Sequence, residues 1–142
     1  MPIASLLSHA RVSTSERALD RPAALAAVAD LIGQPGALEA LLQREQMGST
    51  AIGHGVAVPH GRLADLKEPA GAFLRLATPT TFEDQEVDLL FALLMPTDNP
   101  QLHLHALADV AALFSDENLR ERLRNARDDD ALFHLLTEGA AP

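Results

Sequence analysis

The chain has no cysteine, tryptophan or tyrosine, and each absence removes a class of function. Without cysteine there can be no disulfide scaffold, no zinc-finger ligand set and no thiol nucleophile. Five phenylalanines are too few for the stacking platforms that single-stranded nucleic acid requires. The longest apolar run, residues 89–95, is too short to cross a bilayer, and no signal segment is recognisable. We therefore expect a cytoplasmic protein that does not insert into membranes.

Positive charge is also scarce, because 11 Lys and Arg residues stand against 20 Asp and Glu residues, a formal net charge of −9. A surface of this sign repels nucleic-acid backbones and anionic lipids, and it attracts a protein partner with a basic face. The composition, 47% hydrophobic and 22% charged, is typical of a globular protein. We expect residues 1–142 to form a single domain whose core needs no metal or disulfide.

Apolar residues recur at helical spacing near both ends of the chain. The first such run begins at Asp20, a typical N-cap, and stops at Gly33, a typical C-terminal residue. Asp116 and Asp128 are predicted to cap two later helices in the same way. Helices are thus predicted over residues 20–33, 35–48 and 102–114, and after Asp116 and Asp128.

Strands are predicted between these helices. Residues 87–95 are almost all apolar, which suits a central strand covered on both faces. Because helices lie at both ends and strands in the middle, the sequence predicts an α/β sandwich with helices on both faces of one small sheet. The other predictions are a short helix and then a short strand within residues 7–19, a glycine-rich loop over 48–55, and strands over 56–58 and 70–77, the latter interrupted by Pro79.

Six histidines are the main chemical resource of the chain, since the common enzyme signatures are missing. There is no G-x-S-x-G, no GK[ST] phosphate loop and no H-E-x-x-H. The G-x-G of Gly53 and Gly55 precedes its strand, whereas a dinucleotide fingerprint must follow one. His9 and His134 stand outside any cluster, and we assign them no role.

His60 and His103 are the candidate site residues among these histidines. His60 follows the end of a predicted strand, between a glycine-rich loop and Gly61, and such strand ends often form ligand sites. A loop histidine without a function is the alternative. His103 lies on the inward stripe of its predicted helix, as either a core histidine or part of a site. That stripe is completed by Leu107, Val110, Ala111 and Phe114, and His105 falls beside Asp109 on the polar face, where we expect a surface residue.

Arg44 lies near the end of its predicted helix, where a cation complements the carbonyl dipole. It also precedes the loop that leads to His60, so its guanidinium could instead face an anion there. A metal site built from His54, His60 and His103 is a further alternative. His54 and His60 straddle a short strand at a separation of six without a supporting carboxylate, which argues against that site.

Residues 44–61, REQMGSTAIGHGVAVPHG, resemble the phosphohistidine signature of one family, the mannitol/fructose-class enzyme IIA proteins of the bacterial phosphoenolpyruvate-dependent phosphotransferase system. Residues 87–96 and 103–107 resemble the central strand and second active-site histidine of that family. The resemblance runs from about Leu6 to Leu136. The stand-alone length and the Gly48-Ser49-Thr50 step resemble the nitrogen-regulatory branch, enzyme IIA-Ntr, more than the sugar-specific domains.

The resemblance implies the fold of that class, a small mixed sheet flanked by helices on both faces, and a role for each matched residue. His60 would be the phosphorylated nucleophile, His103 an auxiliary imidazole and Arg44 a cation facing the phosphoryl group. Ser49 and Thr50 match loop positions near the site. The donor would be an HPr-like phosphocarrier protein, with no cofactor and no metal. Two positions depart from the pattern or vary within it: Ala51 stands where glycine is common, and His54 carries over no role.

Three functions follow as hypotheses. The first is a regulatory phosphocarrier whose phosphorylation state decides which target proteins bind. The second is a transport component that passes the phosphoryl group to a sugar-specific IIB partner. The third is a binding module that keeps the fold without accepting phosphate, and the presence of Arg44, His60 and His103 together argues against it.

Overall fold

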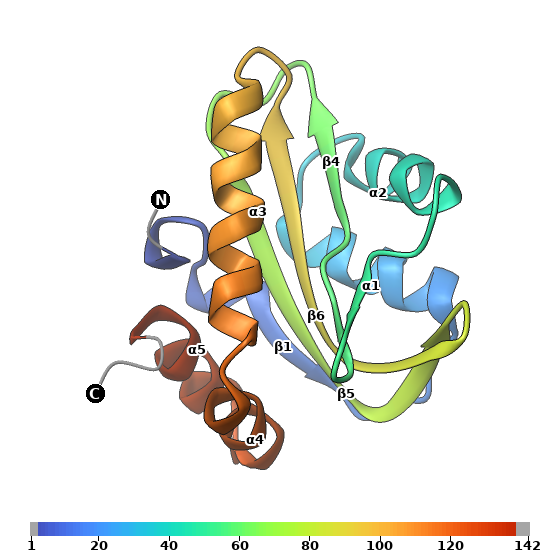
Figure 1. The fold of residues 1–142 in the computed structure, drawn as a ribbon, viewed down its shortest axis with the longest axis vertical. Coiled ribbons are helices and arrows are strands. Elements are labelled where there is room, and N and C mark those ends of the chain that lie inside the picture. The colour runs from blue at the N-terminus through green and yellow to red at the C-terminus, as the bar shows by residue number, and fades with distance from the viewer. Residues whose placement is uncertain (1–2, 139–142) are drawn as a thin grey trace.

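The computed structural model describes residues 3–138, which form one six-stranded sheet with helices on both of its faces (Figure 1). This arrangement confirms the predicted α/β sandwich. Two short 3-10 turns precede the first strand, as Ile3–Ser5 and His9–Arg11. The strands are β1 Val12–Ser15, β2 Ala51–Gly53, β3 Val56–Ala57, β4 His60–Leu63, β5 Ala70–Phe82 and β6 Gln85–Pro96. The helices are α1 Arg21–Ile32, α2 Ala37–Gln46, α3 Pro100–Phe114, α4 Glu117–Asn125 and α5 Asp129–Glu138.

The sheet is mixed and is organised around β6. Its strand order is β1-β5-β6-β3-β2, and β4 also pairs with β6. Strands β5 and β6 are antiparallel, whereas β1 runs parallel to β5, and β3 and β4 run parallel to β6. Val56 of β3 pairs with Leu89, and His60 of β4 pairs with Leu93, so β3 and β4 follow one another along the same side of β6.

Side-chain caps fix the starts of three helices where the sequence predicts them. Asp20 accepts a hydrogen bond from the Ala23 amide at 2.9 Å, and Asp116 accepts one from the Leu119 amide at 3.1 Å. Asp128 does the same for Ala131 at 2.8 Å. Each bond satisfies an amide that the first turn of a helix leaves without a partner.

The structure differs from the sequence-based expectation at several places in the first two-thirds of the chain. Helix α2 begins at Ala37 and not at residue 35, because Gly36 is its N-cap in a left-handed conformation with φ of 83°. The expected loop over residues 48–55 contains β2, which forms a hairpin with β3. Pro79 does not interrupt β5, because the pairing register shifts between Arg75 and Thr80 and leaves the proline outside the ladder.

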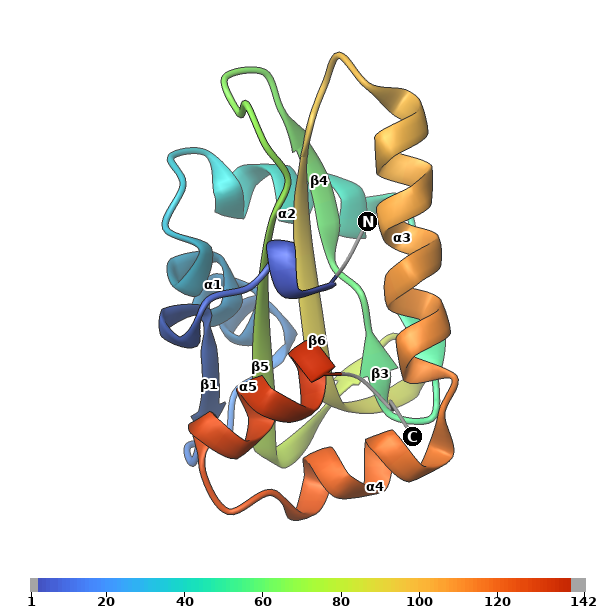
Figure 2. The same cartoon turned by 90° about the vertical axis from the view of Figure 1, so that its left-hand side faces the viewer.

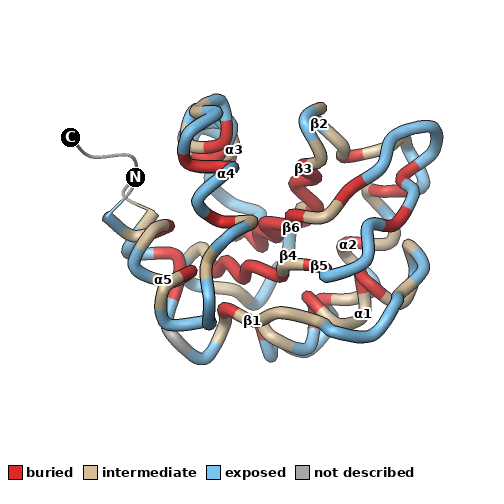
Figure 3. Tube along the Cα trace, turned by 90° about the horizontal axis from the view of Figure 1, so that it is seen from below, coloured by how far each residue is buried: buried red, intermediate tan, exposed pale blue. Residues whose placement is uncertain are grey.

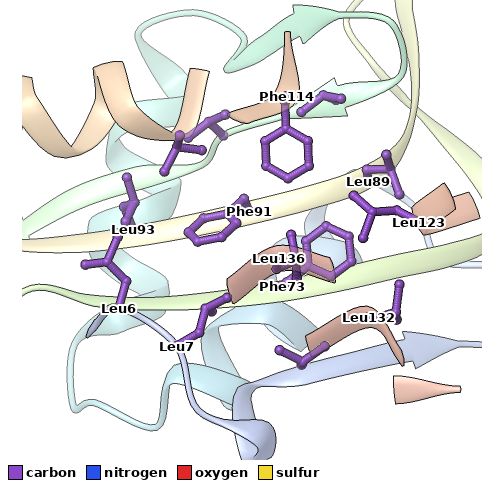
Figure 4. Packing of buried hydrophobic residues seen from close by; sticks show 14 of the residues in the cluster. Leu6, Leu7, Phe73, Leu89, Phe91, Leu93, Phe114, Leu123, Leu132 and Leu136 are labelled. Carbon is purple, nitrogen blue, oxygen red and sulfur yellow. The ribbon is translucent and has the colours of Figure 1, made fainter. Parts of the chain in front are cut away.

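Two hydrophobic clusters lie on opposite faces of the sheet, and Figure 2 shows the sheet between α1 on one side and α3 on the other. Alternate residues of β6 contribute to each cluster. Phe91 packs with Phe73 and Phe114 on the face of α3, α4 and α5, as Figure 4 shows. Leu90 and Leu94 face α1 and α2. The central trace in Figure 3 is accordingly buried, whereas the peripheral loops are exposed.

The inward face of α3 consists of His103, Ala106, Val110 and Phe114. His103 was expected on this face, and it is buried there. The expectation for Ala111 is wrong, because the buried stripe passes through Ala106 and leaves Ala111 exposed. Among residues 3–138, no helix combines the length and the apolar character needed to cross a membrane.

Candidate functional site

His60 begins β4, directly after a break in the strand pairing at Val58 and Pro59. His60 follows the end of β3, as expected, but the sequence did not predict that the chain resumes pairing with β6 at His60 itself. In the described part of the chain, β6 is the only strand that pairs with β4. His60 thus lies half-buried at an open edge of the sheet, between helices that pass on either face.

The pairing register decides which face each residue of β4 presents. His60 pairs with Leu93, which belongs to the cluster under α3, so the His60 side chain faces that helix. Gly61 faces α2 instead, and a Cβ atom there would lie 2.9 Å from the backbone of Ala40. The missing side chain of Gly61 therefore lets α2 pack directly against β4 and brings the last turn of α2 to the sheet edge.

Four basic side chains line one open cavity of about 410 Å³ at this edge. His60 and Arg62 come from β4, Arg44 from α2 and His103 from α3. The rings of His60 and His103 are 5.5 Å apart between centroids, with their planes at 62°. A larger cavity of about 610 Å³ lies between residues 5–11 and the turn over residues 65–70, and its lining contains no histidine. The chemistry therefore points to the smaller cavity.

A backbone carbonyl determines the proton position on His60. Its Nδ1 atom lies 2.8 Å from the carbonyl oxygen of Val58. A carbonyl oxygen can only accept, so Nδ1 must be the N–H donor. The neutral ring then carries its free electron pair on Nε2.

The pKa of His60 is lowered from its ordinary value, mainly because burial disfavours the charged ring. The nearby guanidinium groups of Arg44 and Arg62 lower it further. The hydrogen bond to Val58 and the carboxylate of Glu45 act in the opposite direction without cancelling the shift. His60 is accordingly neutral near pH 7, which is the state in which an imidazole is a nucleophile.

His103 lies in the first turn of α3 and is 8% exposed. Its Nδ1 atom is buried and has no hydrogen-bond partner, which is not the case for its Nε2 atom. Burial first, then the proximity of His60 and Arg62, lowers the pKa of His103. An N–H at the buried Nδ1 would lack an acceptor, so the proton of the neutral ring belongs on Nε2, which is the more accessible nitrogen.

Arg44 occupies the last turn of α2, as expected, and its Nη1 donates to the carbonyl oxygen of Gly48 at 2.9 Å. Gly48 follows Met47, the C-cap of α2, so this bond holds the guanidinium beside the C-terminal end of the helix. It is the only hydrogen bond of the guanidinium within residues 3–138, so the other nitrogens remain available on the cavity side. Arg44 can therefore lie beside the helix C-terminus and still present donors to an anion near His60.

Glu45 is a buried carboxylate that sequence reasoning did not single out. It accepts hydrogen bonds from Arg21 at 2.8 Å, from the Thr50 amide at 3.0 Å and from the Thr50 hydroxyl at 2.7 Å. Thr50 therefore points at Glu45, and the Ser49 hydroxyl accepts from the Ala51 amide at 3.1 Å. Neither Ser49 nor Thr50 lines the cavity, so they hold the loop beside it.

Arg62 is the second residue that sequence reasoning missed. It lies two residues after His60 on the same strand, and strand alternation would have placed both on one face had β4 been recognised. Its pairing partner is Met95, which belongs to the cluster under α3, as Leu93 does. Arg62 is exposed and lines the cavity.

The remaining histidines lie outside the cavity. His54 is exposed at the turn between β2 and β3, and its carbonyl accepts a hydrogen bond from Arg124 near Asp88. His105 is exposed on α3, as expected. His134 contacts Asp130 and Glu138 on α5, and the side chain of His9 lies outside the described structure. Within residues 3–138, no group of three or more His, Cys, Asp or Glu residues is arranged to hold a metal ion.

The Ala51 departure has a local explanation. Ala51 lies within β2 and pairs with Ala57, so its backbone is extended. An extended residue does not need the conformational freedom of glycine. Alanine therefore fits this position without strain.

Comparison with known proteins shows which proteins this chain resembles in sequence and fold. Residues 5–139 match the family model described as "Phosphoenolpyruvate-dependent sugar phosphotransferase system, EIIA 2". A protein of Escherichia coli (strain K12) called nitrogen regulatory protein is 42% identical over 135 residues, which cover 92% of this chain and 83% of that protein.

Solved structures agree with this match. Nitrogen regulatory protein IIA-Ntr from Neisseria meningitidis superposes with a TM-score of 0.86 at 31% identity, covering 95% of this chain and 99% of that one. Enzyme IIAMTL from Escherichia coli, solved in complex with phosphorylated enzyme IIBMTL, shares the fold with a TM-score of 0.75 at 19% identity, covering 93% and 97% of the two chains. The match over residues 5–139 and the 42% identity lead to one conclusion: the chain belongs to the EIIA 2 family of the phosphoenolpyruvate-dependent sugar phosphotransferase system.

Proposed function

We propose that this chain is a phosphocarrier that accepts a phosphoryl group on Nε2 of His60 from the phosphohistidine of an HPr-like carrier protein. One observation carries this proposal: the Val58 carbonyl fixes the proton on Nδ1 of His60, so that the electron pair lies on Nε2, in a ring that lines a cavity shared with Arg44 and His103. We further propose that residues 1–142 act as one domain of this type.

In the transfer step, the N–P bond of the donor phosphohistidine breaks while an N–P bond to His60 Nε2 forms. The electron pair of the broken bond returns to the ring nitrogen of the donor. The His60 ring gains positive charge as it is phosphorylated, and the Val58 carbonyl, 2.8 Å from Nδ1, stabilises that charge. No proton has to leave Nδ1 for the transfer to take place.

The phosphoryl group in transit spreads negative charge over its three equatorial oxygens, in a loose transition state. The guanidinium of Arg44 would bind these oxygens in a forked contact. The Nε2–H of His103 would donate a further hydrogen bond from the α3 side. These donors are held in place before the phosphoryl group arrives, so they need little reorganisation during the reaction.

The regulatory role is the version of this function that the relatives favour. The similar proteins from Escherichia coli and Neisseria meningitidis are nitrogen regulatory proteins, at 42% and 31% identity. The complex with a phosphorylated IIB protein comes from a mannitol protein with only 19% identity. We propose that the phosphorylation state of His60 controls the binding of regulatory target proteins, with transfer to a IIB partner as the second candidate.

The proposal is tested by incubating the protein with phosphoenolpyruvate, enzyme I and an HPr-type carrier, and then measuring its intact mass. We expect the addition of one phosphoryl group that is labile in acid and stable in alkali, as phosphohistidine is. His60→Ala should abolish labelling because it removes the nucleophile. Arg44→Lys should slow labelling, since an ammonium group cannot reproduce the forked contact.

Two outcomes would overturn the proposal. One is an acid-stable label, which would indicate a phosphorylated hydroxyl group. The other is labelling of His60→Ala at the wild-type rate. Circular dichroism of each variant shows whether a lost label reflects lost chemistry or a lost fold.

A further inference from the structure

We propose that Arg62 is a second guanidinium of the phosphoryl site, which binds the oxygens of the transferring group from the β4 side while Arg44 binds them from the α2 side. This inference rests on the proposed function of His60. It adds a residue that the sequence motif does not contain, since the motif ends at Gly61.

Arg62 lies on the same strand as His60. His60 and Arg62 are the first and third residues of β4 and therefore project to the same face of the strand. Their pairing partners on β6, Leu93 and Met95, both belong to the cluster under α3. Arg62 accordingly lines the same cavity as His60 and His103.

In the described structure, the Arg62 side chain is not engaged by any other group of the protein. Within residues 3–138 its side chain makes no ion pair and no hydrogen bond, so the five N–H donors of the guanidinium are available. Four other arginines contrast with it, because their guanidinium groups are engaged by the fold. Arg21 binds Glu45, Arg75 binds the carbonyls of Leu123 and Ala126, Arg120 binds the carbonyl of Phe114, and Arg124 binds Asp88.

The charge of Arg62 already acts on both imidazoles. It contributes to the lowered pKa of His60 and to the lowered pKa of His103. A cation that disfavours a positive charge on these rings is close enough to favour a negative charge between them. An incoming phosphoryl group carries such a charge.

A second guanidinium also increases the number of hydrogen-bond donors that the site offers to the phosphoryl oxygens. Arg44 uses Nη1 for the Gly48 carbonyl, which leaves fewer of its donors for the three equatorial oxygens. Arg62 approaches from the open edge of the sheet and is more exposed than Arg44. It can therefore contact the phosphoryl group while that group is still bonded to the donor ring, as well as during transfer.

The first experiment uses the unphosphorylated protein and compares Arg62→Gln with wild type by NMR titration of the histidine rings. We expect the pKa values of His60 and His103 to rise in Arg62→Gln, because a neighbouring positive charge is removed. Arg122→Gln is the matched control: Arg122 is exposed on α4, lies outside the cavity, and its loss changes the net charge equally. This control should leave both pKa values unchanged. Unchanged values in Arg62→Gln would overturn the inference.

The second experiment is single-turnover labelling by a phosphorylated HPr-type carrier at saturating concentration. We expect Arg62→Gln to label about tenfold more slowly, less than the roughly hundredfold loss typical of a fully enclosed donor, because Arg62 is exposed. Arg62→Lys should recover part of the rate. In phosphorylated Arg62→Gln, 31P NMR should show a raised pKa of the phosphoryl group, an effect that a merely structural residue would not produce.

The outcomes separate the two proposals. If wild-type protein accepts no phosphoryl group, both the proposed function and the role of Arg62 fail. If wild type is labelled and Arg62→Gln is labelled equally fast, only the role of Arg62 fails. A slow Arg62→Gln beside a normal Arg122→Gln supports the inference.

Discussion

A single carbonyl oxygen decides which nitrogen of His60 is free to react. The carbonyl of Val58 is available for the Nδ1–H of His60 because pairing with β6 is interrupted at Val58 and Pro59. The amide of Val58 bonds to the Thr50 carbonyl, and the carbonyl of Pro59 bonds to the Leu93 amide, so the break has a defined geometry. The motif V-P-H thus specifies the tautomer of His60, the proposed nucleophile.

The two histidines of α3 provide a test of helix-face geometry. His103 is buried against His60, whereas His105 is exposed two residues later. His103→Ala should slow single-turnover labelling of His60 by on the order of 10²-fold, because it removes an N–H donor beside the phosphoryl group. His105→Ala should leave the rate unchanged. Equal damage from both substitutions would contradict the assignment of His103 to the site.

A second prediction at this scale concerns pH. The pKa values of His60 and His103 are lowered in the folded protein, so at mildly acidic pH the unfolded chain binds more protons than the folded one. The free energy of unfolding should therefore fall as pH decreases from about 6.5, the ordinary histidine pKa, towards the lowered values. Above that range the two rings contribute no pH dependence.

Urea denaturation at about pH 7.5 and about pH 5.5 measures this effect. The wild-type protein should lose more stability between these pH values than the double variant His60→Gln/His103→Gln, which lacks both titrating rings. Parallel losses in the two proteins would show that neither ring has a lowered pKa. Other titrating groups are common to both proteins and cancel in the comparison.

Residue roles were predictable where sequence position alone sets the environment. The inward position of His103 and the exposure of His105 follow from helical spacing, and the structure confirms both. Glu45 was not predictable, since it is buried only because Arg21 and Thr50, from other elements, supply its partners. A charged residue in the last turn of a polar helix is otherwise expected in solvent.

Among the elements, the β2–β3 hairpin leads directly to His60. Its turn at His54 and Gly55 is held against α4 and β6 by Arg124, which binds the His54 carbonyl and the carboxylate of Asp88. Gly55 has a φ of 81°, and a Cβ atom there would lie 2.5 Å from Arg124 Nη2 and 2.7 Å from Asp88 Oδ1. The ion pair therefore requires glycine at this turn.

Gly53 and Gly55 both have positive φ, but only Gly55 is closely packed, so substituting each by alanine distinguishes the cost of backbone strain from the cost of a steric clash. Gly53 has a φ of 99°, but open space surrounds its missing side chain. Gly53→Ala should reduce the free energy of unfolding by about 1–2 kcal/mol through backbone strain alone. Gly55→Ala should cost at least about 1 kcal/mol more, because it also displaces the Arg124–Asp88 ion pair. Denaturant titration measures the free energy of unfolding of both variants. Equal decreases would mean that displacing the Arg124–Asp88 ion pair does not destabilise the protein.

Elements with strong local signals were predicted well, and short edge strands were not. The caps at Asp20, Asp116 and Asp128 and the apolar run of β6 are local features, so the sequence reveals them. Strands β2 and β4 have only 3 and 4 residues. They form because β2 pairs with the adjacent strand β3 and β4 pairs with the distant strand β6. A glycine-rich segment gives no periodicity from which such pairing could be inferred.

At the scale of the whole molecule, the cavity differs in charge from the rest of the protein. The net charge is −9, yet the cavity lining contains Arg44 and Arg62 and no acidic residue. Long-range attraction therefore favours a basic partner, while the local field favours the phosphoryl group that the proposed donor would carry. The two effects act over different distances.

Varying the salt concentration should distinguish the long-range attraction from the local field of the cavity. With a Debye length of about 10 Å at 0.1 M salt, the long-range attraction is screened first. Stopped-flow measurements should show that rising ionic strength slows association with an HPr-type donor more than it changes dissociation. An association rate that stays constant from low to high salt would show that the net charge has no part in docking.

The topology of the sheet also predicts where the molecule opens first. Strand β6 is paired on both sides, by β5 and by β3 and β4, whereas within residues 3–138 strand β4 is paired on one side only. In hydrogen–deuterium exchange, the amides of β4 should exchange before those of β6 residues 89–93, because an edge strand can detach without dismantling the core. We thus expect the proposed nucleophile, His60, to lie on a strand that detaches locally, while β6, with which β4 pairs, stays in place until global unfolding.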